Sequence, residues 1–171
     1  PLAAKVVSST VLHKSDVGGV IIGIDNEPAL KEAFSRLSRI DGVSGGLVEG
    51  MQSGLELIVG AKIDPQFGPV IVVGIGGTGV EIYQDVAIRM APLAQTDVQS
   101  MVQSLKGRRL LEGYRGGEAI DMQALARTLM TFSALVVDMH DRIASVDLNP
   151  VMCTAAGCTI ADARIIMRQP P

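Results

Sequence analysis

Aromatic side chains are scarce in this sequence. Tryptophan is absent, and phenylalanine and tyrosine together make up 3% of the 171 residues. The formal net charge is only −3. Proteins that bind single-stranded nucleic acid stack its bases on aromatic rings, and proteins that bind phosphate backbones or anionic lipids present basic surfaces. We therefore expect no nucleic-acid partner and no membrane partner.

Long hydrophobic runs are absent too. Glycine, proline or a charged residue interrupts each apolar stretch before it reaches the about 18 residues of a membrane span. The N-terminal pattern of a secretory signal peptide is also missing. With 47% hydrophobic and 19% charged residues, the chain predicts a well-packed cytoplasmic protein of one domain or two small subdomains. Its start at Pro1, within a predicted strand, indicates a piece of a longer protein.

Cysteine is rare as well. Cys153 and Cys158 are the only two, and they flank a predicted turn at residues 155–157. Neither belongs to a C-x-x-C motif, so we expect no zinc site. A cross-strand disulfide can form at these positions, but the cytosolic composition favours free thiols.

The order of apolar and turn-forming residues predicts an α+β fold. Helices are expected to begin at Asn26, at Thr96 (in a capping box with Gln99) and at Asp121, each followed by apolar residues at helical spacing. Because strands and helices do not alternate strictly, we expect sheets with helices packed on one side. Strands are expected at residues 2–7, 20–24, 46–51, 55–61, 70–75 and, as a hairpin, within 146–165.

The predicted hairpin carries polar residues that packing does not explain. Asp147 and Asn149 lie two residues apart and share one face of the first strand, and Asp162 is expected on the partner strand. If the strands pair, Asn149 and Asp162 converge. Mg²⁺ at phosphoryl-transfer sites is usually held by two oxygen ligands, with water and phosphate in the other positions. Solvated polar positions of an ordinary hairpin explain the pattern equally well.

A second polar cluster lies near the N-terminus. His13 and Lys14 precede Gly18 and Gly19, between two predicted strands. A glycine pair lets backbone N–H groups approach phosphate oxygens, and a neutral imidazole can accept a phosphoryl group. A polar turn without chemistry is the competing interpretation. Lys5, on an apolar strand, is explained either by an anionic ligand or by an exposed sheet edge.

Two acids flank the connection between the two halves of the chain. Glu49 and Glu56 suit either ribose binding or turn capping. Residues 74–79, Gly-Ile-Gly-Gly-Thr-Gly, match the dinucleotide-binding motif G-x-G-x-x-G. A helix and a second strand do not fit before the helix expected at Thr96. The spacing therefore favours a glycine turn between neighbouring strands over a dinucleotide-binding fold.

Taken together, these motifs resemble the ATP-grasp domain of the NDP-forming (ADP-forming) acyl-CoA synthetases, which are related to the succinyl-CoA synthetase β subunit. The resemblance covers essentially the whole chain, and the block His-Lys-Ser-Asp-Val-Gly-Gly-Val at residues 13–20 is specific for this group. It implies an ATP-grasp fold of two sheet-plus-helix subdomains, residues 1–48 and 49–171, that is incomplete at its N-terminus. The other motifs lie at residues 4–8, 48–49, 54–60, 64–70, 76–77 with Glu81, 85–93, 113–116 and 147–150 with Asp162.

The resemblance also implies site residues. Asn149 and Asp162 match the two Mg²⁺ ligands. Asp147 matches the acid beside which a travelling phosphohistidine docks, and His13 matches a second phosphoryl carrier. The implied nucleotide site comprises the phosphate-binding Lys5, Gly18 and Gly19, the adenine and ribose hinge Val48 and Glu49, and a further acid, Glu56.

The implied cofactors are ATP or ADP and Mg²⁺, with CoA bound by domains outside this chain. The implied partners are the CoA-binding and phosphohistidine-bearing domains, or a subunit, of the same enzyme, and a homo-oligomer stays open. The family reaction is carboxylate–CoA ligation, and we expect the isolated chain to be inactive. The alternative is a regulatory synthetase-like module of a protein-lysine acetyltransferase.

Overall fold

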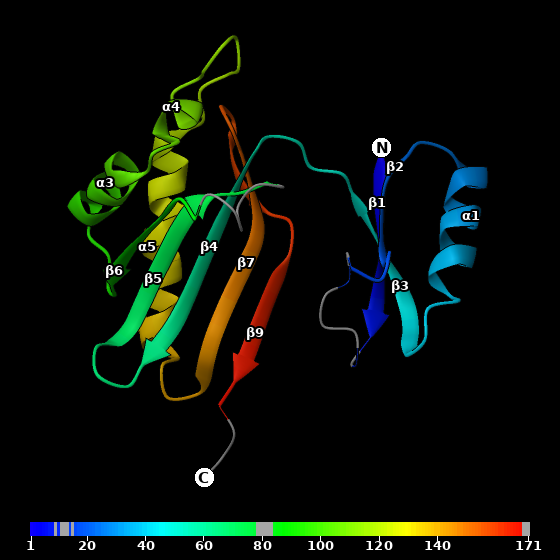
Figure 1. Cartoon of the computed structure of the whole chain (residues 1–171), viewed down its shortest axis with the longest axis horizontal. Helices are drawn as coiled ribbons and strands as arrows, with labels where there is room; N and C mark the ends of the chain where they lie inside the picture. The colour runs from blue at the N-terminus through cyan, green and yellow to red at the C-terminus, as the bar shows by residue number, and fades with distance from the viewer. Residues whose placement is uncertain (9, 11–13, 15, 78–83, 169–171) are drawn as a thin grey trace. The chain divides into compact units, whose positions relative to one another are not determined.

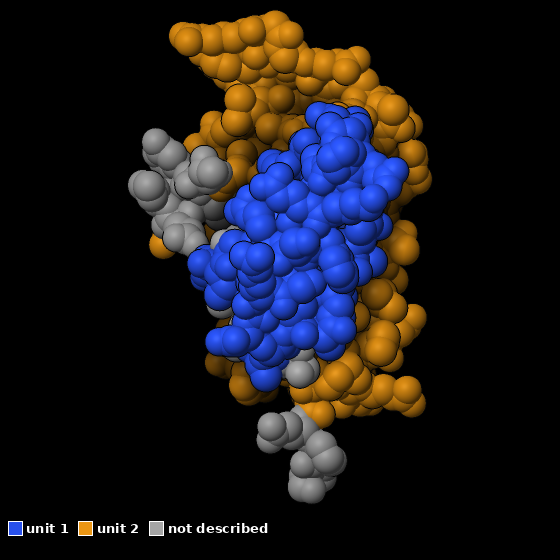
Figure 2. Space-filling model, turned by 90° about the vertical axis from the view of Figure 1, so that its right-hand side faces the viewer, with its two compact units in different colours: residues 1–52 blue, residues 53–171 orange. Residues whose placement is uncertain are grey.

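The computed structural model describes residues 1–8, 10, 14, 16–77 and 84–168. The chain forms two compact units, Pro1–Gln52 and Ser53–Pro171, which are coloured separately in Figure 2. The assignment of residues 1–48 and 49–171 to two ATP-grasp subdomains stays a prediction. None of the described helices combines the length and the apolarity that a bilayer crossing requires.

Unit 1 is a three-stranded antiparallel sheet with one helix on one face (Figure 1). Its strands are β1 (Leu2–Ser8), β2 (Val20–Ile24) and β3 (Val43–Gly50), in the order β2-β1-β3. The helix is α1 (Glu27–Leu37), and it begins as predicted, because the side chain of Asn26 accepts a hydrogen bond of 2.9 Å from the Ala29 amide.

A small hydrophobic core joins α1 to β1 and β2. The buried members are Ala4, Val6, Ile24, Ala33 and Leu37. Phe34, expected on the same helical stripe, is instead 58% exposed. The apolar stripe of α1 is therefore wider than the core that buries it, and Phe34 lines an apolar hollow with Leu30 and Val48.

Unit 2 is built on a six-stranded sheet in which every described pair is antiparallel. Three helices pack behind one face of it, and the opposite face carries no helix of this unit (Figure 1). The strand order is β6-β5-β4-β7-β8, with β9 also paired to β7. The elements are β4 (Leu55–Asp64), β5 (Gly68–Ile75), β6 (Val86–Met90), α3 (Gln95–Ser104), α4 (Arg108–Leu111), α5 (Met122–Asp138), β7 (Ile143–Thr154), β8 (Gly157–Ile160) and β9 (Ala163–Met167).

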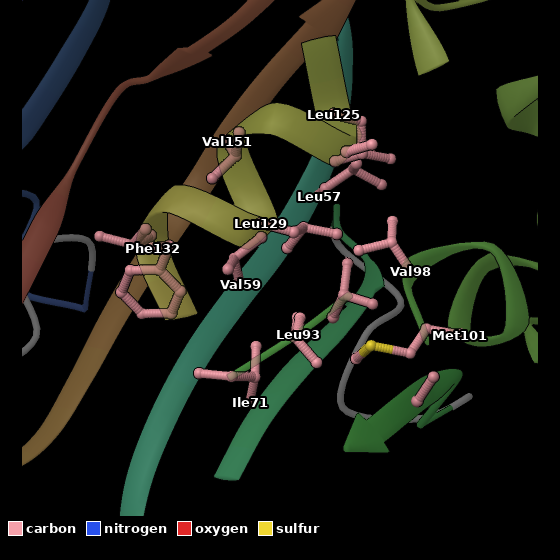
Figure 3. Packing of buried hydrophobic residues seen from close by; sticks show 14 of the residues in the cluster. Leu57, Val59, Ile71, Leu93, Val98, Met101, Leu125, Leu129, Phe132 and Val151 are labelled. Atoms are coloured by element: carbon pink, nitrogen blue, oxygen red, sulfur yellow. The ribbon is translucent and has the colours of Figure 1, made fainter. Parts of the chain in front are cut away.

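The main core lies between this sheet and α5. Figure 3 shows Leu125, Leu129 and Phe132 of α5 packed with Leu57 and Val59 of β4. All of these side chains are at least nine-tenths buried. Because successive strand residues point to opposite faces, this packing fixes which residues of β4 and β7 stand on the helix-free face.

Two expectations on local structure were wrong. α3 begins at Gln95 with Ala94 as its N-cap rather than with a Thr96–Gln99 capping box, and the carboxylate of Asp97 accepts a hydrogen bond of 2.8 Å from the Ala94 amide. Cys153 and Cys158 form a disulfide instead of free thiols. They lie directly opposite each other in the β7–β8 pairing, which brings the two sulfur atoms within bonding reach.

The pairing of β5 with β6 excludes a dinucleotide-binding fold. The segment Gly-Ile-Gly-Gly leaves β5, and the chain returns in β6, which is antiparallel to β5. A Rossmann unit requires parallel strands joined by a helix. The sequence-based preference for a connection between neighbouring strands is therefore confirmed.

Asp64 closes the turn between β4 and β5. One of its carboxylate oxygens accepts hydrogen bonds from the amides of Gln66 (2.8 Å) and Phe67 (2.9 Å). These two bonds favour the ionised form and lower the pKa of Asp64 below its usual 3.8. The stability they contribute is present above about pH 3.8 and is lost as pH falls through the lowered pKa.

We expect Asp64→Asn to lower the free energy of unfolding near neutral pH, because the amide lacks the charge that strengthens both hydrogen bonds. Below about pH 4 the difference from the wild type should shrink progressively, because the wild-type carboxylate itself becomes protonated. Urea denaturation of the wild type and the variant at several pH values measures this. Asp41→Asn, at an exposed acid, is the control. A stability difference for Asp64→Asn that does not change with pH would contradict the role assigned to the charge.

Candidate functional site

Lys5 and Glu49 form an ion pair on the face of the unit 1 sheet that points away from α1. The distance from Lys5 Nζ to a carboxylate oxygen of Glu49 is 2.6 Å. Lys5 lies on the central strand between the buried Ala4 and Val6, and its side chain is 12% exposed. The exposed-edge explanation of Lys5 is therefore wrong, and an anionic partner is present within the chain itself.

Val48 does not share that face. It lies directly opposite Ala4 and lines an apolar hollow with Leu30 and Phe34 of α1. Glu49, the next residue, points to the other side. The side chains of the two predicted hinge residues, Val48 and Glu49, therefore lie on opposite faces of the sheet. On the face that carries Glu49, Val48 can contribute only its backbone.

The glycine pair is anchored to β1 beside Lys5. The Gly19 amide donates to the Lys14 carbonyl (2.7 Å), and the Val6 amide donates to the Gly19 carbonyl (2.9 Å). Gly18 has a φ of +69°, a conformation that favours glycine. Lys5 pairs with Val20, the residue that follows the glycines. The structure therefore brings Lys5, Glu49 and the glycine pair together, whereas His13 lies outside the described residues.

The helix-free face of the unit 2 sheet carries the predicted acids. Glu56 of β4 and Asp147 of β7 are exposed and alternate with buried neighbours that face the helices. Asp147 lies directly opposite Gly60 on one side and Arg164 on the other. Gly60 itself is buried, and a Cβ there would lie 3.0 Å from Val72 Cγ1, so glycine lets the side chain of Val72 on β5 pack close to this strand.

Asn149 and Asp162 meet at an irregularity in the sheet. The Asn149 amide donates to the Asp162 carbonyl at 3.2 Å, and the Ala161 amide donates to the Pro150 carbonyl at 3.0 Å. Asp162 was expected within a strand, but it lies in the break between β8 and β9. Pro150 has no amide hydrogen to donate, and β7 holds one more residue than β4 at this point, so regular pairing stops here.

The donor set at this irregularity fits Mg²⁺. It offers an amide oxygen from Asn149 and a carboxylate from Asp162, which are hard oxygen ligands. Among the described residues, no three His, Cys, Asp or Glu side chains gather into a cluster that could hold a metal. A closed zinc-type site is therefore not formed by these residues. Two ligands leave positions for water and phosphate, as Mg²⁺ sites in phosphoryl transfer require.

The glycine-rich segment after β5 starts at the same end of the sheet as Glu56. The Gly76 amide donates to the Glu56 carbonyl at 2.7 Å, and a Cβ on Gly76 would lie 2.8 Å from the backbone of Glu56. Gly77 comes within 3.9 Å of the Glu56 carboxylate by the same measure. The approach at Gly76 leaves no room for a side chain, so only glycine fits there. Glu81 lies outside the described residues.

Sequence reasoning missed Asp85 and Arg164 as functional candidates. The carboxylate of Asp85 accepts hydrogen bonds from the amides of Lys106 (2.8 Å) and Gly107 (2.7 Å), and so ties the end of the glycine-rich segment to the start of α4. The signal for Asp85 was its place in the motif at residues 85–93. Arg164 had no signal other than its position two residues after Asp162.

We expect Gly19→Ala to destabilise the protein by about 1–3 kcal/mol, because the added methyl group would lie 2.7 Å from Val6 Cγ2 and 2.8 Å from the Lys14 carbonyl oxygen. Gly45→Ala is the matched control, since a Cβ there meets no described atom within 4 Å. Chemical denaturation measures both variants. Equal stability of the two would contradict the close approach at Gly19.

Comparison with known proteins places this geometry in a family. A family model described as ATP-grasp domain matches residues 1–167. The ADP-forming acetate–CoA ligase I of Archaeoglobus fulgidus is 41% identical over 174 residues, which cover 98% of this chain and 25% of that protein. The beta subunit of the ADP-forming acetate–CoA ligase I of Pyrococcus furiosus is 35% identical over 175 residues, with 98% and 75% covered.

The fold is also similar to that of a solved structure. It is the acetyl-coenzyme A synthetase 1 of Ca. Korarchaeum cryptofilum, in complex with coenzyme A and Mg-AMPPCP, with its phosphohistidine segment pointing towards the nucleotide-binding site. It superposes with a TM-score of 0.86 at 39% identity and covers 98% of this chain and 76% of that chain. The chain spans only a quarter of the length of the Archaeoglobus relative. From its sequence, its fold and these matches, the chain belongs to the ATP-grasp domain family.

Proposed function

We propose that this chain is the nucleotide-binding part of an NDP-forming acyl-CoA synthetase. The observation that carries the proposal is the meeting of Asn149 and Asp162 at the β7 irregularity, on a chain that aligns over 98% of its length with ADP-forming ligases. The reaction is acyl-CoA + ADP + phosphate ⇌ carboxylate + CoA + ATP. The part proposed for this chain is the transfer of the phosphoryl group between the nucleotide and a histidine.

The described residues of unit 2 suit the phosphate end of a nucleotide. Asn149 and Asp162 would hold Mg²⁺, which when bound neutralises phosphate charge. Asp147 lies on the same open face and would orient the imidazole of an incoming phosphohistidine by accepting its N–H. Glu56 lies at the end of the sheet where the glycine-rich segment starts, and it would contact the nucleotide site there.

Unit 1, taken by itself, also carries groups that suit a nucleotide. The ammonium of Lys5 and the Gly18 amide are suited to phosphate oxygens, and Gly19, whose own amide donates to the Lys14 carbonyl, would shape the turn at which phosphate approaches. Glu49, already paired with Lys5, would accept hydrogen bonds from ribose hydroxyl groups, and the main chain of Val48 would meet adenine. His13 is proposed as a second phosphoryl carrier on the strength of its motif alone.

The proposed partners are the CoA-binding and phosphohistidine-bearing parts of the same enzyme. The Archaeoglobus relative is a chain about four times the aligned length, whereas the Pyrococcus relative is a separate beta subunit. The same domain therefore serves either within a long chain or as a subunit. Both relatives are named as ligases, which favours this function over the acetyltransferase module expected as the alternative.

We expect Asn149→Ala and Asp162→Ala each to lower acyl-CoA-dependent ATP formation by the full-length protein by at least about tenfold, because each removes an oxygen ligand of Mg²⁺. Acetyl-CoA is the first substrate to test, given the acetate ligases among the relatives. Binding of Mn²⁺ in the presence of ADP, followed by electron paramagnetic resonance, gives a second readout that does not depend on turnover.

Asp141→Asn is the matched control, since this acid is exposed and is paired with His140 away from the site. It should leave ATP formation and Mn²⁺ binding unchanged. Variants of Asn149 and Asp162 with wild-type metal binding would show that the metal assignment is wrong. A wild-type protein that forms no ATP with any acyl-CoA would count against the synthetase function as a whole.

A further inference from the structure

Arg164 occupies a position on β9 that the sequence did not single out. It lies directly opposite Asp147 in the β7–β9 pairing, so both side chains stand on the helix-free face of the sheet. Directly opposite residues of antiparallel strands have Cβ atoms about 4.5–5.5 Å apart. Arg164 also follows Asp162 by two residues. Arg164 is thus next to Asp147, the acid predicted to meet the phosphohistidine, and two residues from Asp162, a predicted ligand of Mg²⁺.

The structure does not engage Arg164 in a salt bridge. Within the described residues, the guanidinium has no carboxylate within 4.0 Å, although Asp147 is its direct neighbour across the strands. The side chain is exposed, and β9 lies at the edge of the sheet. Its five N–H donors are therefore open to an anion that approaches the helix-free face.

The charge of this face calls for a cation at that place. Glu56, Asp147 and Asp162 are acids that would repel the phosphoryl group that the proposed reaction moves across them, and the cation Lys62 on this face lies opposite Ser145 rather than Asp147. Mg²⁺ held by Asn149 and Asp162 would offset part of this repulsion. A guanidinium presents two parallel N–H groups that match two oxygens of one phosphoryl group.

We infer that Arg164 binds the transferred phosphoryl group beside Asp147, as a further catalytic residue of the site. The inference rests on the proposed function. The phosphoryl group has two sources, the terminal phosphate of the nucleotide and the phosphate carried on the partner's histidine, and both present the same oxygens. Arg164 forms and breaks no covalent bond; it holds the oxygens while the phosphorus–oxygen or phosphorus–nitrogen bond is exchanged.

The test compares Arg164→Gln, which removes the charge, with Arg164→Lys, which keeps the charge but loses the paired donors. Both are made in the full-length protein, with its partner subunit where it has one. Calorimetry measures the affinity for Mg-AMPPCP and for adenosine, and a quenched-flow assay measures histidine phosphorylation from ATP. Circular dichroism melting confirms that each variant folds like the wild type.

We expect Arg164→Gln to weaken one of the two phosphoryl-dependent readouts by roughly ten- to a hundredfold, the size of a lost charge-assisted hydrogen bond. Adenosine affinity should stay unchanged, and Arg164→Lys should recover part of the loss. A weaker affinity for Mg-AMPPCP identifies the nucleotide phosphate as the bound group. Unchanged affinity with slower histidine phosphorylation identifies the phosphoryl group on the histidine.

Lys62→Gln is the matched control. Lys62 is an exposed cation of β4 on the helix-free face, and it lies opposite Ser145 rather than Asp147. An equal loss in Lys62→Gln would indicate a general electrostatic field and would overturn the inference. So would an Arg164→Gln loss that disappears in the Asp147→Asn background, since Arg164 would then act only through Asp147.

The outcomes also separate this inference from the function on which it rests. A wild-type protein that binds Mg-AMPPCP or phosphorylates the histidine, together with an Arg164→Gln variant that does so equally well, overturns the role of Arg164 alone. A wild-type protein that does neither overturns the proposed function, and the role of Arg164 with it.

Discussion

The register of β7 against its neighbours is the constraint on which the candidate site depends. β7 pairs with β4 along one side and with β8 and β9 along the other. A shift by one residue would turn Leu148 to solvent and Asp147 into the core. The buried apolar residues of β7 prevent such a shift, because burying a carboxylate without a partner is far more costly than any gain in pairing.

The core between α5 and the sheet holds β7 rigidly in this register. α5 buries a continuous apolar stripe against β4 and β7, and the opposite face is left to polar side chains and to glycine. The packed sheet holds the backbone of Asp147 and Asn149 in β7, whereas Asp162 lies in the break between β8 and β9 and is tied to β7 by the hydrogen bond from the Asn149 amide to its carbonyl. The irregularity at Asn149 and Pro150 is the one place where β7 leaves regular pairing with both of its neighbours, and it is where the two proposed metal ligands meet.

In unit 1, too, the packed sheet positions polar groups on the face that is not covered by its helix. A central lysine is held by a glutamate from the next strand, and a glycine pair packs against the backbone of β1. Ion pairing lets Lys5 stay largely buried, which an unpaired ammonium rarely does. The Archaeoglobus and Pyrococcus relatives are named ADP-forming acetate–CoA ligases, and the polar faces of the two units carry oxygen-bearing and cationic side chains.

The sequence by itself determined the longer helices and most strands, the caps at Asn26 and Asp121 and the face on which Asp147 stands, because these follow from local spacing and from apolar alternation. It did not predict β6, the short helix α4 or the break that separates β8 from β9. Only the tertiary structure decided that Lys5 pairs with Glu49, that Asp85 ties down residues 106–107, that Cys153 bonds Cys158 and that Arg164 faces Asp147. Each of these contacts depends on which strands or loops pair and in which register. Pairing is set by the packing of the whole core, and local sequence does not encode it.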